Sequence, residues 1–366
     1  MSTRNKPAWV ALAAALSAWA QPAPPSLKVS FPADSPLAPL SVDSGGSRAD
    51  ARGGAMVLDL HTALTLRNSS QRRIRGVTLL VQAQEFSPGG RGSVAVPSLD
   101  VRPGETFPVR IDLRLLRPLV AGGGPLAEVS LDGVLFDDLS FYGPDRLSSR
   151  RSMTIWELEA RRDRRYFKSV LEARGPAGLQ REIVESLDRM APRLDVQVIR
   201  RGRSTAVAAQ ERDCQFAFLQ IPADSPIVPV SGLAHVAGSE ARAPRIEVRN
   251  RSDRSISYFE IGWIIKDREG REFLAGSVPA SSSGPKLAPG ASSQVWEDVS
   301  LKFAREAGQP VAIEGMSGFV SQVEFADGSF WIPGRNALAP SPEEQRLGDL
   351  YRRHGLPVLL NELKKF

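Results

Sequence analysis

The segment Phe31–Leu40, with the sequence FPADSPLAPL, returns as Ile221–Val230, with the sequence IPADSPIVPV. The distance from Pro32 to Pro222 is 190 residues, about half of the 366-residue chain. A repeat of this length indicates a duplicated domain, because each copy is far longer than the unit of a solenoid. Proline removes a backbone donor, so we expect both segments to run along a sheet edge or to cross between sheets.

Further motifs follow in the same order in both halves. The paired motifs are Asn68 and Asn250, Pro103-Gly104 and Pro289-Gly290, 136–142 (FDDLSFY) and 325–331 (FADGSFW), and Gly175 and Gly355. The extra residues of each half fall in polar loops, Ser44–Gly54 in the first and Ser281–Gly284 in the second. Length changes in loops are compatible with one common strand framework.

The strand pattern predicts a mainly β fold. Short alternating runs are separated by Gly and Pro turns, which is typical of a β-sandwich or barrel and not of a βαβ sheet. The period then changes to helical spacing at Met153, Trp156, Ala160, Phe167 and Val170, and again after a Gly175-Pro176 break. We therefore expect two tandem antiparallel β-sandwiches, each followed by a short amphipathic helical pair. The expected boundaries are 26–145 and 193–335 for the sandwiches, and 146–192 and 336–366 for the helical pairs.

The N-terminus predicts export. Arg4 and Lys6 precede a short apolar run, and Ala18-Trp19-Ala20 supplies the small-residue pattern of a signal-peptidase site. Residues 1–20 are therefore interpreted as a signal peptide cleaved after Ala20, followed by a Pro-rich linker at 21–25. The apolar run is shorter than the roughly 20 residues that span a bilayer. We expect a soluble protein of the periplasm or the exterior, and the Arg/Ala/Gly/Pro-rich composition is typical of a bacterium.

Composition and charge exclude several classes of protein. Hydrophobic residues make up 42% and charged residues 24%, as in a folded globular chain. The net charge of +6 is small for this length and predicts no nucleic-acid partner. A single cysteine, Cys214, excludes an intramolecular disulfide and a Cys-based zinc site. Its strand-like surroundings predict a small buried hydrophobe.

No catalytic, cofactor or metal motif stands out. His61, His235 and His354 lie far apart in the sequence, and no HExxH, GxSxG or P-loop pattern is present. Asp327-Gly328 is interpreted as a type I′ hairpin turn and not as a calcium ligand. Asn68 and Asn250 fit the glycosylation pattern, but a turn role explains both, since Asn tolerates the left-handed conformation and caps its own backbone. The sequence thus predicts no catalytic residue, cofactor or metal.

Two groups of residues are candidates for interaction. Arg161, Arg162 and Arg165 belong to an Arg-rich helical stretch, which could contact an anionic surface or, with Glu157, Glu159 and Asp163 interleaved, form a solvated face. Trp263, Trp296 and Trp331 lie in strands of the second copy. Exposed, they would stack on sugar rings; buried, they would belong to the core.

The Arg-Asn-x-Ser turns at 67–70 and 249–252, the Pro-Gly turns and the short strands resemble immunoglobulin-like or fibronectin-III-like β-sandwiches of bacterial exported proteins. The resemblance covers roughly residues 26–142 and 213–332 and lacks the cysteine pair of antibody-type domains. It implies a binding or scaffolding role by analogy. Our first hypothesis is a non-enzymatic exported protein that contacts a protein or another component of the cell envelope. The alternatives are a carbohydrate-binding module that uses the three tryptophans, and a hydrolase whose site is assembled between the domains.

Overall fold

The computed structural model describes residues 26–84, 89–119, 125–189, 192–200, 211–219, 221–279, 286–296, 299–305, 308–335 and 340–366. The predicted signal peptide, the linker at 21–25 and the Ser281–Gly284 insertion lie outside these ranges. The backbone of Trp296 is described, but its side chain is not.

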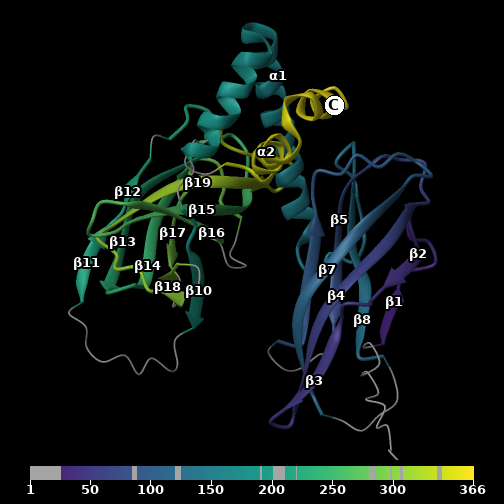
Figure 1. Cartoon of the computed structure of the whole chain (residues 1–366). Coiled ribbons are helices and arrows are strands. Elements are labelled where there is room, and N and C mark those ends of the chain that lie inside the picture. Colours follow the sequence, from purple (N-terminus) through teal and green to yellow (C-terminus); the bar gives the residue numbers. More distant parts are fainter. Residues whose placement is uncertain are drawn as a thin grey trace, which may run out of the picture. The chain divides into compact units, whose positions relative to one another are not determined.

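The described chain is mainly β and carries two helices (Figure 1). The N-terminal half contains two sheets. The first has the order β1-β8-β5-β6, with β9 paired to β8, and the second has the order β2-β4-β3, with β7 paired to β4. Their bounds are β1 (Leu27–Ser30), β2 (Leu37–Asp43), β3 (Arg48–Arg52), β4 (Ala55–Asn68), β5 (Ile74–Gln82), β6 (Arg91–Val96), β7 (Thr106–Pro118), β8 (Ala127–Phe136) and β9 (Phe141–Tyr142).

The C-terminal half also contains two sheets. One has the order β10-β18-β14-β13-β11, with β17 paired to β14, and the other has the order β12-β19-β15-β16, with β20 paired to β19. The bounds are β10 (Asp195–Arg200), β11 (Arg212–Gln215), β12 (Ala217–Phe218), β13 (Ile227–Ala237), β14 (Glu240–Asn250), β15 (Ile256–Lys266), β16 (Glu272–Pro279), β17 (Ser292–Trp296), β18 (Val299–Ala304), β19 (Gly315–Phe325) and β20 (Phe330–Trp331).

The described chain divides into two compact units. One comprises the residues up to Arg73 with Thr78–Ala95 and Val101–Asp132, and the other comprises Ile74–Val77, Val96–Asp100 and Gly133–Phe366. The boundaries expected from the sequence at residues 145, 192 and 335 remain predictions.

Both halves repeat the same strand connections around the Pro-rich motif. β1 pairs in parallel with β8, and β12 pairs in parallel with β19. β9 and β20 then pair antiparallel with β8 and β19, through Val134↔Tyr142 and Val323↔Trp331. A bulge interrupts the pairing after Pro39 and after Pro229, as expected where proline withholds a donor.

Asn68 and Asn250 hold equivalent loops together. Asn68 Nδ2 donates to Arg72 O and Val101 O at 2.7 and 3.1 Å, and Asn250 Nδ2 donates to Arg254 O at 2.8 Å and to Leu287 O and Ala288 O at 3.0 and 3.1 Å. Each Asn Oδ1 accepts from the backbone N–H two residues later, so the predicted capping turn is confirmed. Neither residue has a positive φ, so these turns form without the left-handed conformation that Asn tolerates. Both are fully buried, and each amide supplies donors to loop carbonyls that have no partner strand.

The predicted type I′ turn at Asp327-Gly328 is also wrong, since only Gly328 has a positive φ, of 81°. Gly328 N donates to Phe325 O, and Phe325 N donates to Ser329 O, which is a three-residue hairpin loop. The first copy has the same two bonds, from Leu139 N to Phe136 O and from Phe136 N to Ser140 O. Leu139 adopts φ 65° at the place that Gly328 occupies, a strained conformation for a leucine.

Helices α1 (Ser149–Asp188) and α2 (Pro342–Leu363) each bend at one glycine. Gly175 has φ 67° and ψ −174°, and Gly355 has φ 77° and ψ −178°, so the break predicted at Gly175-Pro176 is confirmed. The helices pack through a small apolar cluster of Phe167, Leu179, Ile183, Leu347, Leu359 and Leu363. Within the described ranges, neither helix combines the length and apolar character needed to cross a bilayer.

The two C-terminal sheets share one hydrophobic core. It includes Phe259 and Ile261 from β15, Val323 from β19, and Val248 and Phe303 from β14 and β18. Cys214 belongs to this core and is buried, so its predicted role as a small hydrophobe is confirmed. Burial also raises the pKa of its thiol.

Candidate functional site

The three candidate tryptophans do not form an exposed platform. Trp263 is 2% exposed and its ring packs edge-on against Phe216 at 4.8 Å. Trp331 is half-buried against the same core, and its Nε1 donates to Asp224 Oδ2 at 3.1 Å. Trp331 thus ties the Pro-rich loop to β20. Stacking on a sugar by all three rings would need Trp263 at the surface, and it is not there.

The three candidate arginines of α1 have different surroundings. Arg165 is exposed, and its Nε donates to Arg161 O at 3.2 Å. Arg161 is half-buried; its Nε donates to Glu157 Oε1 at 2.8 Å and its Nη2 to Asp137 O at 2.5 Å. Arg162 donates to Asp163 on the same helix and to Pro333 O in the segment after β20.

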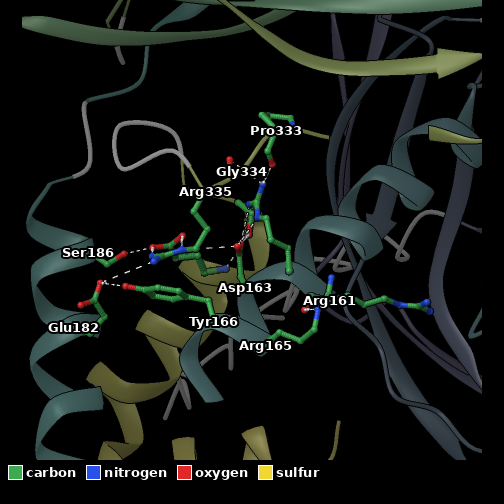
Figure 2. A network of polar contacts seen from close by, with 12 residues as sticks. Arg161, Asp163, Arg165, Tyr166, Glu182, Ser186, Pro333, Gly334 and Arg335 are labelled. Atoms are coloured by element: carbon green, nitrogen blue, oxygen red, sulfur yellow. Dashed lines mark hydrogen bonds and ion pairs between the residues drawn. The ribbon is translucent and has the colours of Figure 1, made fainter. Parts of the chain in front are cut away.

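A buried carboxylate, Asp163, is the centre of a polar network between α1 and α2 (Figure 2). Arg162 donates to both of its oxygens, at 2.7 and 3.1 Å, and Ser341 Oγ donates to Oδ2 at 2.5 Å. Ser341 is also the N-cap of α2, where its hydroxyl accepts from Glu344 N at 3.1 Å. One carboxylate of α1 therefore fixes the start of α2.

Arg335 is the second cation of the network. Its Nη2 donates to Glu344 Oε1 at 2.5 Å, and Ser186 Oγ donates to the same oxygen. Its guanidinium lies 3.7 Å from the ring centroid of Tyr166, whose hydroxyl donates to Glu182 Oε1 at 2.7 Å. Burial and this bond to Glu182 raise the pKa of the Tyr166 hydroxyl. Burial alone would lower the pKa of Arg335, but Glu344 outweighs it and the pKa is raised.

Arg164 lies on the other side of α1 and is also buried. Its Nε donates to Glu343 Oε1 at 2.7 Å, and its guanidinium lies 3.6 Å from the ring centroid of Phe366. Arg346 binds both oxygens of Glu343 at 2.8 Å. Burial opposes ionisation of Glu343, but the two arginines outweigh it and lower its pKa to about 2. The expectation of a solvated arginine face is therefore wrong for Arg164, because its counter-charge comes from the distant helix α2.

A cavity of about 380 Å³ lies beside this network, between β12, β19 and the segment that follows β20. Its walls are mostly apolar, from Phe218, Leu219, Ile221, Pro222, Pro229, Gly318, Phe319, Val320, Pro333, Gly334 and Arg335. Arg162 Nη1 donates to Pro333 O at 2.8 Å and to Gly334 O at 3.4 Å. The network therefore binds two residues of the cavity lining, Pro333 and Gly334, whose contacts Figure 2 shows.

Neither arginine of the network directs an uncompensated charge into the cavity. Arg162 is paired with Asp163, and Arg335 with Glu344. Paired buried charges contribute mainly to position, since their Coulomb attraction is offset by the cost of desolvation. The cavity can therefore accept an uncharged apolar group. The nearby charged side chain of Arg162 positions Pro333 and Gly334 by hydrogen bonds to their carbonyls.

The histidines do not complete a nucleophile–base pair. His61 Nδ1 lies 2.9 Å from Asp112 Oδ1 and His235 Nδ1 lies 2.8 Å from Asp213 Oδ1, both at the surface. Ser47 is near His61 in the chain fold, but its Oγ accepts from the backbone N–H of His61 and contacts the Thr62 hydroxyl. In the part of the chain that the structure describes, no three His, Cys, Asp or Glu side chains form a group that could hold a metal ion.

Sequence reasoning named Arg162 but missed Arg335 and the cavity. The signal was present in the repeat, because Phe330–Arg335 (FWIPGR) matches Phe141–Arg146 (FYGPDR) with the same Pro and Arg spacing. The cavity lies where β12 and β20 pair with different parts of the same edge of β19. No local sequence pattern encodes this long-range pairing.

No model of a known protein family matches the chain, and no curated protein sequence matches it. Among solved structures, the chain is similar to a β-glucosidase from Kluyveromyces marxianus, with a TM-score of 0.15, 9% identity, and coverage of 73% of this chain and 45% of the glucosidase. It is also similar to red sea bream transglutaminase, with a TM-score of 0.13, 10% identity and coverage of 78% and 31%. A structure titled pT26-6p gives a TM-score of 0.18, 8% identity and coverage of 88% and 73%. The chain thus spans less than half of the first two proteins.

Proposed function

We propose that this chain is a non-enzymatic exported protein, built of two tandem immunoglobulin-like β-sandwiches with a helical pair after each, that contacts another protein. The repeated parallel strand, the Asn-held loops and the glycine-bent helices support a duplicated module. Such modules serve as binding scaffolds in many exported proteins, so the role follows by analogy and needs a site to support it.

The observation that carries the proposal is the apolar cavity beside β19. Hydrogen bonds position the segments beside it, since Arg162 of α1 donates to Pro333 O and Trp331 donates to Asp224 of the Pro-rich loop. Its size lies in the range of about 300–1,000 Å³ that small binding pockets have. A pre-formed apolar pocket favours recognition of a neutral group, and its lining has no paired nucleophile and base.

Export is part of the proposal and has its own test. A signal peptide cleaved after Ala20 gives a mature protein that begins with Gln21. Mass spectrometry of the protein recovered from the envelope or medium of a bacterial host would show this new N-terminus. Recovery of the intact chain with Met1 from the cytoplasm would contradict the proposed location.

The function is tested by capture from the envelope fraction of the source cells with the immobilised mature chain. Recovery of one protein in stoichiometric amount is the expected result, and recovery of glycan alone would contradict it. The variant Ile221→Trp, which fills the cavity, tests whether the captured protein depends on that site. Phe31→Trp, at the matching position of the first repeat, is the control.

A further inference from the structure

The cavity coincides with a gap in the sheet. β12 pairs with β19 only at Ser317 and Gly318, and β20 pairs with the same side of β19 at Val323 and Glu324. The opposite side of β19 is paired with β15 along its length. Between the two short partners, in the described chain, no strand lies against residues 319–322.

The backbone of Val320 is directed toward this gap. Leu219 N donates to Gly318 O at 2.9 Å, so the peptide groups of Gly318 face β12. Backbone groups two residues apart point to the same side of a strand, so the N–H and C=O of Val320 face the side on which β12 has already ended. Among the described residues, no backbone group reaches Val320 from that side.

The residues on either side of Val320, Phe319 and Ser321, contact β15 instead. Phe319 faces Gly262 of β15 in the ladder. Ser321 is the extra residue of a bulge, and its Oγ donates to Glu260 O at 3.2 Å. Val320 therefore presents an open donor and acceptor; it is 5% exposed and lines the cavity. Unpaired backbone groups in a low-dielectric site are costly, and a bond made there is strong.

We infer that an extended, uncharged peptide segment of a partner protein adds to β19 in this gap. Its backbone bonds to the N–H and C=O of Val320, and an apolar side chain enters the space between Phe218, Ile221 and Phe319. Strand addition of this kind combines main-chain hydrogen bonds with pockets for side chains. The gap of four residues admits about 13 Å of extended chain, at about 3.3 Å per residue.

The chemistry of the walls defines the segment. Arg335, the charged residue in the lining, is paired with Glu344, so a carboxylate or phosphate gains no free cation. Pro222, Pro229 and Pro333 bring rigid apolar surface without backbone donors. A segment of alternating β-branched or aromatic and small polar residues fits both the ladder and the cavity. This inference rests on the proposed function and names the kind of partner.

The experiment measures binding of a labelled pool of tetrapeptides, blocked at both ends, in which Thr alternates with Val, Ile, Leu or Phe. The same pool, N-methylated at every amide, keeps the side chains but removes the backbone donors. We expect the full mature chain to bind the unmethylated pool at least about tenfold more tightly, the effect of roughly 1.4 kcal/mol. Ile221→Trp should lower the affinity by a similar factor, and Phe31→Trp should leave it unchanged.

In the peptide assay, three outcomes would overturn the inference: no binding of the pool, equal binding of the methylated pool, or displacement of the pool by decanoate or maltose at a lower concentration than by unlabelled peptide. The methylation comparison uses the unmodified protein, so it remains decisive if Ile221→Trp fails to fold. Capture of the same envelope protein by Ile221→Trp and by the unmodified chain would leave the proposed function standing and overturn this inference. Capture of no protein would overturn the proposed function instead.

Discussion

The two copies of the repeat use the same local sequence differently after their last short strand. Phe141–Arg146 and Phe330–Arg335 share Phe, Pro and Arg at the same spacing, yet Arg146 is exposed and the Arg335 side chain is 18% exposed. In the first copy α1 begins at Ser149, directly after the loop, and in the second α2 begins only at Pro342. The longer connection lets the second arginine turn inward, where it lines the cavity and meets Glu344.

This difference predicts the largest effect on stability. Arg335→Met should lower the free energy of unfolding by about 3–5 kcal/mol, because Glu344 is left in a buried site without its cation. Arg146→Met, the matched change at an exposed side chain of the first copy, should alter it by no more than about 1 kcal/mol, the most that exposed charge contacts contribute. Urea unfolding of both variants measures the two values. Equal losses would show that the burial of Arg335 has no energetic consequence.

The buried asparagines are a feature that the two copies share, since Asn68 and Asn250 both donate to loop carbonyls. Asn250→Ala removes donors to three carbonyls and should cost about 2–4 kcal/mol, while Asn68→Ala removes donors to two and should cost somewhat less. Thermal and urea unfolding provide the measurement. Asn68→Ser or Asn250→Ser, which retain a short polar group, should not restore stability because a hydroxyl cannot reach the same carbonyls. A neutral effect at either site would contradict the role of the amide as a replacement for a partner strand.

Much of this local construction could be predicted from the sequence. The repeat located both asparagine turns and the bends at Gly175 and Gly355, because Gly, Pro and Asn impose their preferences on the backbone nearby. The burial of Arg164 could not be predicted, since its partner Glu343 lies 179 residues away. Trp263 belongs to a strand that is buried on both faces, where alternation gives no signal for exposure.

Leu139 and Gly328 occupy equivalent positions in the two hairpin loops, so each residue can be substituted by the one found in the other copy. Leu139→Gly should stabilise the protein by about 0.5–1 kcal/mol, since Leu139 has φ 65° where glycine is unstrained. Gly328→Leu should destabilise it by about 1–2 kcal/mol for the same reason. The melting temperatures of the two variants test the equivalence of the loops. The account of this turn fails if both substitutions shift stability in the same direction.

The smallest effect concerns pH and contrasts α1 with α2. Burial raises the pKa of Glu159 to about 7, whereas that of Glu343 is lowered to about 2. Between pH 4.5 and 7 the folded protein holds a proton on Glu159 that the unfolded chain has released, so this group lowers stability as pH rises. Glu343 acts oppositely, because its stabilisation is present above pH 4.5 and is lost as pH falls toward 2.

Glu159→Gln should therefore be more stable than the unmodified protein at pH 8, by about 0.5–1 kcal/mol, and equal to it at pH 4.5. Unfolding in urea at a series of pH values measures this difference. Glu172→Gln, an exposed change on the same helix, is the control and should give a difference that does not vary with pH. If Glu159→Gln raised the free energy of unfolding equally at all pH values, the ionisation of Glu159 would not be the cause.

In the binding mode proposed above, a partner binds to the second copy at the open side of β19. Amide hydrogen exchange of the mature chain, followed by NMR with and without the blocked peptide pool, compares Val320 with Leu131, which precedes Val134 by the three residues that separate Val320 from Val323. We predict that saturating peptide slows exchange at Val320 at least about tenfold and leaves Leu131 unchanged. Unchanged exchange at Val320, or equal slowing at both amides, would contradict the account.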